Sequence, residues 1–341
     1  MPQDHAAEAP TPETPTPETL TPETLTPETP PADPPPADPG DIARLRRFNR
    51  AATSAAGVLD ASFLGRGRPL GESRMLHALG PDGDEVGAAR ARLGLDSGLA
   101  SRLLRSLEAE GLIETVRHPE DGRRRIARPT ARGRAEFAAY ERLSDAHASA
   151  TMARFGRAAP DLLAAMDRLA CALGADRIAL RVADPESPEA QACMAAYYAE
   201  LDRRFASGFD VDSSGDPEAA SMRAPRGAFL LAEFDGAAIG CAGLAGPETA
   251  PSAGGEGERK AGRTGEVKRV WIAPQARGLG LSRRLMSATE DVARGLGMTR
   301  LRLDTNGALT EAAALYRRMG WREIERYNDN PYAELFFDKP L

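Results

Sequence analysis

The residues from Val267 to Leu281 constrain the fold of this chain most, because they describe a strand, a turn and the start of a helix in immediate succession. An apolar strand runs into Pro274 and then into a turn that contains Gly278 and Gly280. Glycine lets a backbone approach a ligand closely, and the first turn of a helix directs unpaired N–H groups and a positive dipole end toward an anion. We therefore expect a helix from 279 to about 296 whose N-terminus binds the pyrophosphate of a nucleotide cofactor.

Charge divides the chain into three segments. Residues 1–40 hold eight acidic residues and no lysine or arginine, 41–174 hold 22 arginines against 17 acidic residues, and 175–341 hold 22 basic against 25 acidic residues. A basic segment in a chain whose net charge is −6 favours a polyanionic partner for that segment alone. We expect three parts with these boundaries.

The first segment cannot form a core. It contains 13 of the 27 prolines and a five-residue repeat that begins at Thr11, TPETP-TPETL-TPETL-TPETP. Low hydrophobicity, uniform negative charge and frequent proline favour a disordered, extended tail. Such a tail is either a spacer or a competitor of DNA for the basic segment.

Cysteine and apolar patterns exclude several classes of protein. The three cysteines, Cys171, Cys193 and Cys241, fit neither a disulfide framework nor the spacing of a zinc site, so we expect them to be reduced and buried. No apolar run has the length of a membrane span, and the N-terminus lacks the pattern of a signal peptide. The expected location is cytoplasmic, without a membrane partner.

The second segment has the order of a winged helix-turn-helix. Asp96 is placed as the N-cap of a helix over 97–110, whose Leu99, Leu103 and Leu107 form an inward stripe. A strand over 112–118, a turn and a return strand over 123–128 then predict a hairpin with an arginine-rich tip. In this layout the helix enters a major groove and the wing contacts backbone or minor groove. The alternative is a helical scaffold with a solvated arginine cluster.

The stretch LDSGLASRLLRSLEAEGLIETVRHPEDGRRRIARPTARGRAEF resembles the MarR family of transcriptional regulators, with Asp121 and Arg123 at its Asp-x-Arg wing motif. The resemblance covers about 41–174. It implies binding to double-stranded DNA and a homodimer through the first helix and the last two, over about 130–155 and 158–173. The expected DNA-binding residues lie on the outer face of the helix and on the wing: Ser97, Ser101, Arg102, Arg105, Asp121, Arg123, Arg124 and Arg125.

The third segment alternates strands and helices. Strands are expected over 177–182, 228–234, 237–244, 266–273, 299–304, 322–327 and 334–338, with helices over 188–205 and 310–319. The implied fold class is multidomain, a mostly α winged helix-turn-helix domain plus an α/β fold with a mixed, mostly antiparallel sheet flanked by helices. All four histidines precede this segment, which argues against a histidine base or metal site and leaves direct transfer between two bound substrates.

Two motifs in this segment resemble the GNAT N-acetyltransferase superfamily. QARGLG, which begins at Gln275, fits its acetyl-CoA signature, and ALYRRMGW, which ends at Trp321, fits its A-x-x-L-Y block. The likeness covers about 175–341 and implies acetyl-CoA as co-substrate, without a metal, and an amine acceptor that is a small molecule or a protein lysine or N-terminus. The expected cofactor-binding residues are Val270, Trp271, Ile272, Gln275, Arg277, Gly278, Leu279, Gly280, Leu281, Ser282 and Asn306.

Acetyl transfer to an amine needs a neutral amine, a polarised carbonyl and a proton for the leaving thiolate. Glu266 is the candidate base, acting through water, and is equally well read as a solvated strand-end carboxylate. A backbone N–H near Val270 or Trp271 is the candidate to polarise the carbonyl. The resemblance places Tyr316 as the acid. The family's asparagine position, seven residues before that tyrosine, is Leu309 here, while Asn306 either serves the cofactor or caps a helix.

The acceptor site is poorly defined by sequence. Its candidates on and after the first helix of this segment are Tyr197, Tyr198, Glu200, Arg204 and Phe209, whose spacing also suits ordinary amphipathic packing. The sequence thus predicts a bifunctional transcriptional regulator and acetyl-CoA-dependent N-acetyltransferase. The alternatives are a regulator whose GNAT-like half only senses acyl-CoA, and an enzyme whose winged helix only dimerises.

Overall fold

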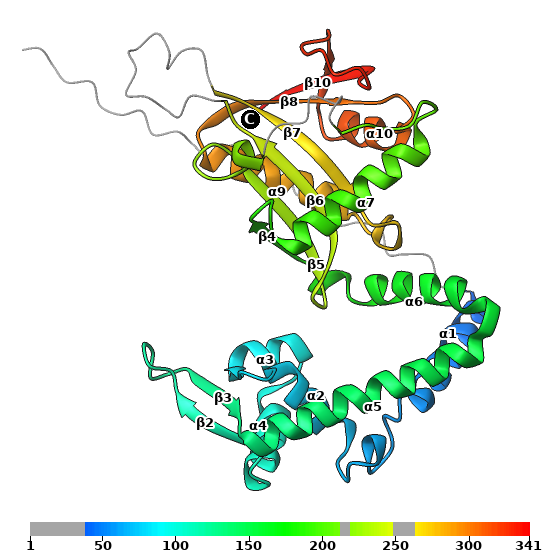
Figure 1. The fold of residues 1–341 in the computed structure, drawn as a ribbon, viewed down its shortest axis with the longest axis vertical. Helices are drawn as coiled ribbons and strands as arrows, with labels where there is room; N and C mark the ends of the chain where they lie inside the picture. Colours follow the sequence, from blue (N-terminus) through cyan, green and yellow to red (C-terminus); the bar gives the residue numbers. More distant parts are fainter. Residues whose placement is uncertain (1–37, 212–218, 248–262) are drawn as a thin grey trace, which may run out of the picture. The chain divides into compact units, whose positions relative to one another are not determined.

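The computed structural model describes residues 38–211, 219–247 and 263–341 (Figure 1). The chain folds into two compact units, Met1–Ala146 and His147–Leu341, which are described separately below. The expected disordered tail lies outside the described residues except for its last three. Within the described residues, no helix is long and apolar enough to cross a membrane.

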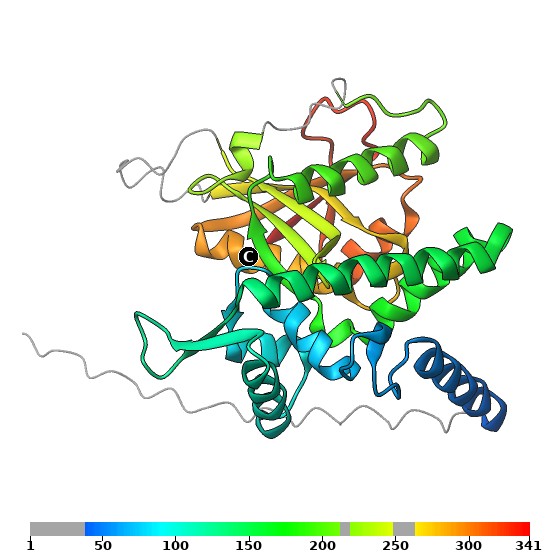
Figure 2. The same ribbon diagram turned by 60° about the horizontal axis from the view of Figure 1, so that its bottom comes forward.

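The first unit is mostly helical and carries a small antiparallel sheet of order β1-β3-β2 (Figure 2). Asp96 caps α4 by accepting a hydrogen bond from the Leu99 N–H at 2.9 Å, as the sequence predicted. The hairpin of β2 and β3 is the expected wing. The elements are α1 (Pro39–Ala55), α2 (Leu70–Leu79), β1 (Asp84–Glu85), α3 (Val86–Leu93), α4 (Ser97–Ala109), β2 (Ile113–Arg117), β3 (Arg125–Pro129) and α5 (Ala131–Phe155), whose second half belongs to the other unit.

The buried face of α4 differs from the predicted stripe. Ala100, Leu104 and Leu107 are buried in the core, at the i, i+4 and i+7 positions of one helix face. Leu99 and Leu103 are only partly buried, because that face is turned by one position. A Cβ on Gly71 of α2 would lie 3.4 Å from a Leu103 methyl, so Leu103 covers the space above this glycine. The predicted stripe is therefore confirmed at Leu107, while Leu103 packs against the core from the margin of the buried face and Leu99 is only half-buried.

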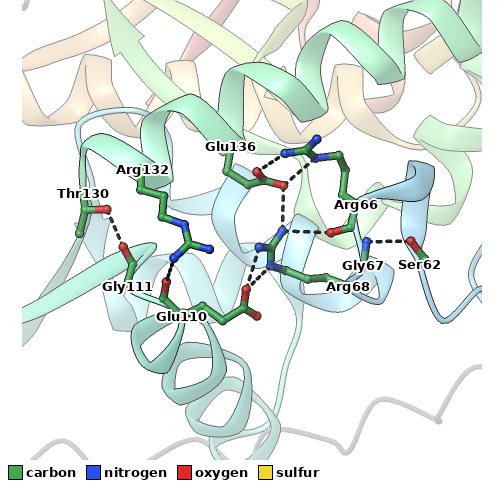
Figure 3. A network of polar contacts seen from close by, with 9 residues as sticks. All are labelled: Ser62, Arg66, Gly67, Arg68, Glu110, Gly111, Thr130, Arg132 and Glu136. Atoms are coloured by element: carbon green, nitrogen blue, oxygen red, sulfur yellow. Dashed lines mark hydrogen bonds and ion pairs between the residues drawn. The ribbon is translucent and has the colours of Figure 1, made fainter.

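An ionic network links the end of α4 to α5 (Figure 3). Arg68 donates to Glu110 at 2.8 Å and to Glu136 at 2.8 Å, and Arg66 donates to Glu136 at 2.9 Å. Glu136 is 8% exposed, and the hydrogen bond from Arg66 contributes most to lowering its pKa below the ordinary value. The carboxylate of Glu136 is therefore ionised. Through Arg68 it links α5 to Glu110 at the end of α4.

The second unit contains a sheet of order β4-β5-β6-β7-β8-β10-β9 in its described residues. Only β7 and β8 are parallel, so the sheet is mixed and mostly antiparallel, as expected. The elements are α6 (Ala159–Leu173), β4 (Ala179–Ala183), α7 (Pro188–Arg204), β5 (Ala228–Phe234), β6 (Ala237–Ala245), β7 (Arg263–Ile272), α9 (Leu281–Gly295), β8 (Met298–Thr305), α10 (Thr310–Arg318), β9 (Arg322–Ile324) and β10 (Leu335–Pro340).

Alternating side chains of β5 divide the core of this unit between two faces of the sheet. Phe229 and Leu231 join the cluster that contains residues of α7, whereas Leu230 and Ala232 join the cluster that contains residues of α9. The helices α7 and α9 therefore cover opposite faces of the sheet (Figure 1). All three cysteines are free and buried, as predicted.

Candidate functional site

The turn between β7 and α9 has the shape of an anion-binding cradle. Gly278 and Gly280 have φ values of 80° and 74°, in the left-handed region that other residues rarely adopt. A Cβ built on either glycine would meet no atom within 4 Å, so the space beside the turn is open. No side chain caps the N-terminus of α9. The N–H groups of this first turn suit a diphosphate, because helix N-termini attract anions.

The strand that leads to this turn separates from its parallel neighbour. Pairing between β7 and β8 covers only Arg263–Glu266, while β7 stays paired with β6 as far as Ile272. The register with β6 shifts between Cys241 and Gly243, near Arg269, whose φ is 56°. The edge of β7 beyond Glu266 therefore faces β8 without ladder hydrogen bonds and offers backbone groups to an extended ligand.

A pocket lies where β7 and β8 separate. It is lined by residues 267–270 of β7, 304–306 at the end of β8, Leu309, Tyr316 of α10 and the C-terminal part of α7. Of the predicted site residues, Val270, Asn306 and Tyr316 line this pocket. Glu266, Trp271, Ile272, Gln275 and residues 277–282 do not. The predicted set thus divides into a pocket group and a turn group on the same strand-turn-helix.

Tyr316 is 5% exposed and lines the pocket from α10. Its ring packs against those of Trp321 and Phe337, with centroids 6.1 and 5.7 Å away. Burial, and then the nearby carboxylate of Asp304, raise the pKa of the phenol well above its ordinary value. The hydroxyl is therefore protonated at neutral pH, which a proton donor requires.

A charged network that the sequence did not indicate supports the pocket. Lys268 is 8% exposed and its ammonium lies 2.9 Å from Asp304 and 3.2 Å from Glu266. Burial alone would lower the pKa of Lys268, but these two carboxylates outweigh it and raise the pKa. Asn328 donates to Asp304 at 2.6 Å and thereby fastens the loop before β10 to β8. Charged residues at alternate positions of a strand ordinarily indicate a solvent-exposed face. The burial of Lys268 against Asp304 could therefore not be recognised from the sequence.

The carboxylate of Glu266 has a hydrogen-bond partner besides Lys268. It accepts a hydrogen bond from the Tyr327 hydroxyl at 2.8 Å, and burial followed by the charge of Glu266 raises the pKa of that tyrosine. Asn306 is also engaged, because it donates to the carbonyl of Tyr332 at 2.7 Å and accepts from the Ala308 N–H at 2.9 Å. Its side chain fixes two loop segments beside the pocket.

Some of the remaining predicted cofactor residues make contacts within the protein, and the others lie on the open turn. Trp271 donates from its ring nitrogen to Glu200, and the Arg277 side chain donates to the Ile272 carbonyl at 2.9 Å and to Glu200. Leu281 is buried, and Leu279 packs against the core under the turn. The other members are exposed or half-buried on the turn: Gln275, Gly278, Gly280 and Ser282.

In the first unit, the predicted DNA-binding side chains are exposed on α4 and the wing, at Ser97, Ser101, Arg102, Arg105 and residues 121–125. Asp121 accepts a hydrogen bond from the Arg123 N–H at 3.0 Å, so it shapes the wing turn. Arg124 pairs with Glu85 of β1. In the described residues, no group of three or more histidine, cysteine, aspartate or glutamate side chains is arranged to bind a metal.

Comparison with known proteins identifies both units. Residues 194–321 match the acetyltransferase (GNAT) family, and residues 66–124 match the MarR family. The chain is 32% identical over 145 residues to an IAA acetyltransferase of Azospirillum brasilense, which covers 42% of this chain and 86% of the relative. It is 31% identical over 101 residues to an uncharacterised N-acetyltransferase of Escherichia coli K12, covering 30% of this chain and 54% of that protein.

Among solved structures, the chain is similar to a GNAT family acetyltransferase from Elizabethkingia anophelis with acetyl-CoA bound, at 16% identity and a TM-score of 0.33. That match covers 49% of this chain and 99% of the other. The family match, over residues 194–321, includes the strand, turn and helix described above. The chain therefore belongs to the GNAT acetyltransferases, as an acetyl-CoA-dependent N-acetyltransferase that also carries a MarR family domain.

Proposed function

We propose that the chain is bifunctional. Its MarR domain, within 41–174, binds double-stranded DNA as a dimer, and its GNAT domain, 175–341, transfers the acetyl group of acetyl-CoA directly to an amine in a ternary complex. Residues 1–40 form an acidic tail outside both domains. The family matches to the two parts of one chain support this reading.

The cofactor's diphosphate is proposed to bind the amides of residues 277–282, with its pantetheine arm along the free edge of β7. Open space at Gly278 and Gly280 and the uncapped start of α9 support this position. The residues fit the group, since the turn supplies N–H donors and positive dipole without a side chain in the way. Bound acetyl-CoA would supply an activated thioester carbonyl.

The residues around the pocket are proposed to move protons and polarise that carbonyl. A backbone N–H near Val270 or Trp271 would donate to the carbonyl oxygen, and Tyr316 would protonate the leaving thiolate. Glu266, which lies outside the pocket lining, would accept the amine's proton through water. The position of the Tyr316 phenol, buried in the pocket lining, is the single observation that carries the proposal.

An acceptor screen tests the catalytic part. Release of free thiol from acetyl-CoA is measured with a panel of amines for the wild type and for Tyr316→Phe. A lower rate of thiol release in Tyr316→Phe supports Tyr316 as the proton donor, whereas equal rates reject that role.

The dimer is supported by exposed apolar side chains. On α1, Ile42, Leu45 and Phe48 are 46%, 54% and 41% exposed, and on α6, Met166 and Leu169 are 43% and 40% exposed. Isolated chains rarely leave such helix faces in water, so a second copy is the proposed cover. Light scattering of the full chain tests the dimer directly. The proposal predicts twice the mass of one chain.

One residue supports a second candidate function, in which the GNAT domain only senses acyl-CoA. Leu309 stands where the family resemblance expects an asparagine, and it lines the pocket. A domain that only senses acyl-CoA would bind the cofactor without turnover. Thiol release with any amine discards this candidate.

A further inference from the structure

Three aromatic side chains form one continuous part of the pocket lining. Phe205, Phe209 and Tyr332 all line the pocket and are half-buried. Their ring centroids lie 5.9 Å apart for Phe205 and Phe209, 5.9 Å for Phe205 and Tyr332, and 4.9 Å for Phe209 and Tyr332. Because every pair is in contact, the rings leave no open centre that could enclose a cation. We call this surface the aromatic wall.

Hydrogen bonds hold the aromatic wall in place. The Asp210 N–H donates to the Tyr332 hydroxyl at 3.0 Å, and Asn306 donates to the Tyr332 carbonyl at 2.7 Å. The Phe209 N–H donates to Asp202 at 3.1 Å. These bonds position Tyr332 and the backbone of Phe209, and a surface positioned in advance lowers the entropic cost of binding against it.

A carboxylate lines the same pocket close to this wall. Asp304 accepts a hydrogen bond from Asn330 at 3.3 Å, and Asn330 in turn accepts from the Tyr332 N–H at 3.1 Å. Asn330 therefore links this carboxylate to the backbone of Tyr332. This carboxylate already pairs with the buried Lys268 ammonium at 2.9 Å, so it holds the pocket lining together and leaves the rings as the surface that a ligand meets.

We propose that the acceptor is a small primary amine carried on a flat aromatic body whose ring packs against the aromatic wall. This substrate class rests on the proposed acetyl transfer. In that reaction the amine nitrogen forms a bond to the acetyl carbon and the carbon–sulfur bond breaks. The nitrogen loses one proton and the thiolate gains one, so the products are an N-acetyl amine and free thiol.

Binding is measured by calorimetry on the full chain saturated with coenzyme A, which binds the cofactor site without turnover. The probes are 2-phenylethylamine, 2-cyclohexylethylamine, which matches it in carbon skeleton but is not flat, and putrescine, a diamine without a ring. We expect 2-phenylethylamine to bind about tenfold more tightly than either, the order of one well-formed ring contact. Equal affinities, or tighter binding of the cyclohexyl amine or the diamine, overturn the proposal.

A pair of variants locates the preference. Phe209→Leu keeps an apolar side chain but removes a ring of the wall, so the ratio of the phenyl to the cyclohexyl affinity should fall about fivefold. Phe234→Leu, a half-buried ring of β5 outside the pocket lining, should leave that ratio unchanged. A ratio that Phe209→Leu does not move, or that both variants reduce alike, contradicts the assignment.

Turnover separates this inference from the proposed function. Thiol release from acetyl-CoA without any preference among the amines supports acetyl transfer and rejects the aromatic acceptor. A ring preference in binding without thiol release from acetyl-CoA supports the wall as the ligand site and rejects the transfer.

Discussion

The carboxylate of Glu200 on α7 holds the guanidinium of Arg277, the residue at the start of the turn before α9. The same carboxylate accepts a hydrogen bond from the ring nitrogen of Trp271 at 2.9 Å. Burial would raise the pKa of Glu200, but the hydrogen bonds from Arg277 and Trp271 outweigh it and lower the pKa. Glu200 therefore ties the turn to α7, and Arg277 is left to offer its backbone to a ligand.

Glu200→Gln should raise the KM for acetyl-CoA roughly tenfold, because a neutral amide holds Arg277 less firmly and the turn loses its fixed position. Steady-state kinetics at a saturating amine concentration measures this. Glu233→Gln is the matched control, since Glu233 pairs with Arg181 on β4 and lies outside the pocket lining. A similar KM in both variants would mean that the ion pair does not position the turn.

The same ion pair predicts acid sensitivity. Since the pKa of Glu200 is lowered in the folded chain from an ordinary value of 4.5, its stabilising contribution is present above about pH 4.5 and is lost as the pH falls through the folded value. The melting temperature of the wild type should therefore fall more than that of Glu200→Gln on acidification from about pH 5 to about 3. Parallel curves for the two proteins would disprove this contribution.

Tyr316→Phe should lower kcat about a hundredfold and leave the KM for acetyl-CoA nearly unchanged, because a general acid acts in the transition state. Tyr140→Phe serves as control, since Tyr140 is buried in the core of the first unit. A variant that retains wild-type kcat would exclude Tyr316 as the proton donor.

The pH profile gives an independent test of this acid. The pKa of Tyr316 is raised from 10.0 by burial and then by Asp304, so the phenol keeps its proton as the pH rises and loses it only above the ordinary value. We expect no alkaline decline of kcat that depends on Tyr316 up to about pH 10. A decline between pH 8 and 10 that is present in the wild type and absent from Tyr316→Phe would contradict the shifted pKa.

On the wing, Arg123→Ala should weaken binding to duplex DNA and reduce the slope of log affinity against log salt by about one. Arg123 is exposed at the hairpin tip, where its own N–H is fixed by Asp121. The control is Arg154→Ala, an exposed arginine of α5 that is not part of the β2–β3 hairpin. An unchanged salt slope in Arg123→Ala would remove the wing from the DNA interface.

Glu136→Gln should destabilise the MarR domain by about 2 kcal/mol, because Arg66 and Arg68 lose their shared buried carboxylate. Chemical denaturation measures the change. Glu141→Gln on the same helix is the control, since Glu141 forms only an exposed pair with His77. Equal stability of the two variants would show that the network of Figure 3 contributes little.

Local patterns predicted most of the fold. The expected strand over 228–234 matches β5, and the helix expected over 310–319 differs from α10 by one residue. Strand alternation, glycine turns and the Asp96 cap are encoded within a few residues of where they act, which is why they could be read directly. The turn was read from Gly278 and Gly280 on the same grounds, whereas the role of Tyr316 came from the family resemblance alone.

Long-range features were missed for the opposite reason. Arg66 and Glu136 lie 70 positions apart, and Lys268 meets Asp304 across 36 positions, so neither pair leaves a local signal. The irregular backbone of β7 at Arg269 depends on its pairing with β6. Burial of a charged strand residue can be recognised only once the partner strand is known.

A crystal structure of the full chain with coenzyme A is the most direct test of the cofactor site. We predict that diphosphate oxygens accept hydrogen bonds from amides of residues 277–282 and that the thiol lies within reach of the Tyr316 hydroxyl. A diphosphate bound away from this turn, or a Tyr316 hydroxyl remote from the sulfur, would contradict the account.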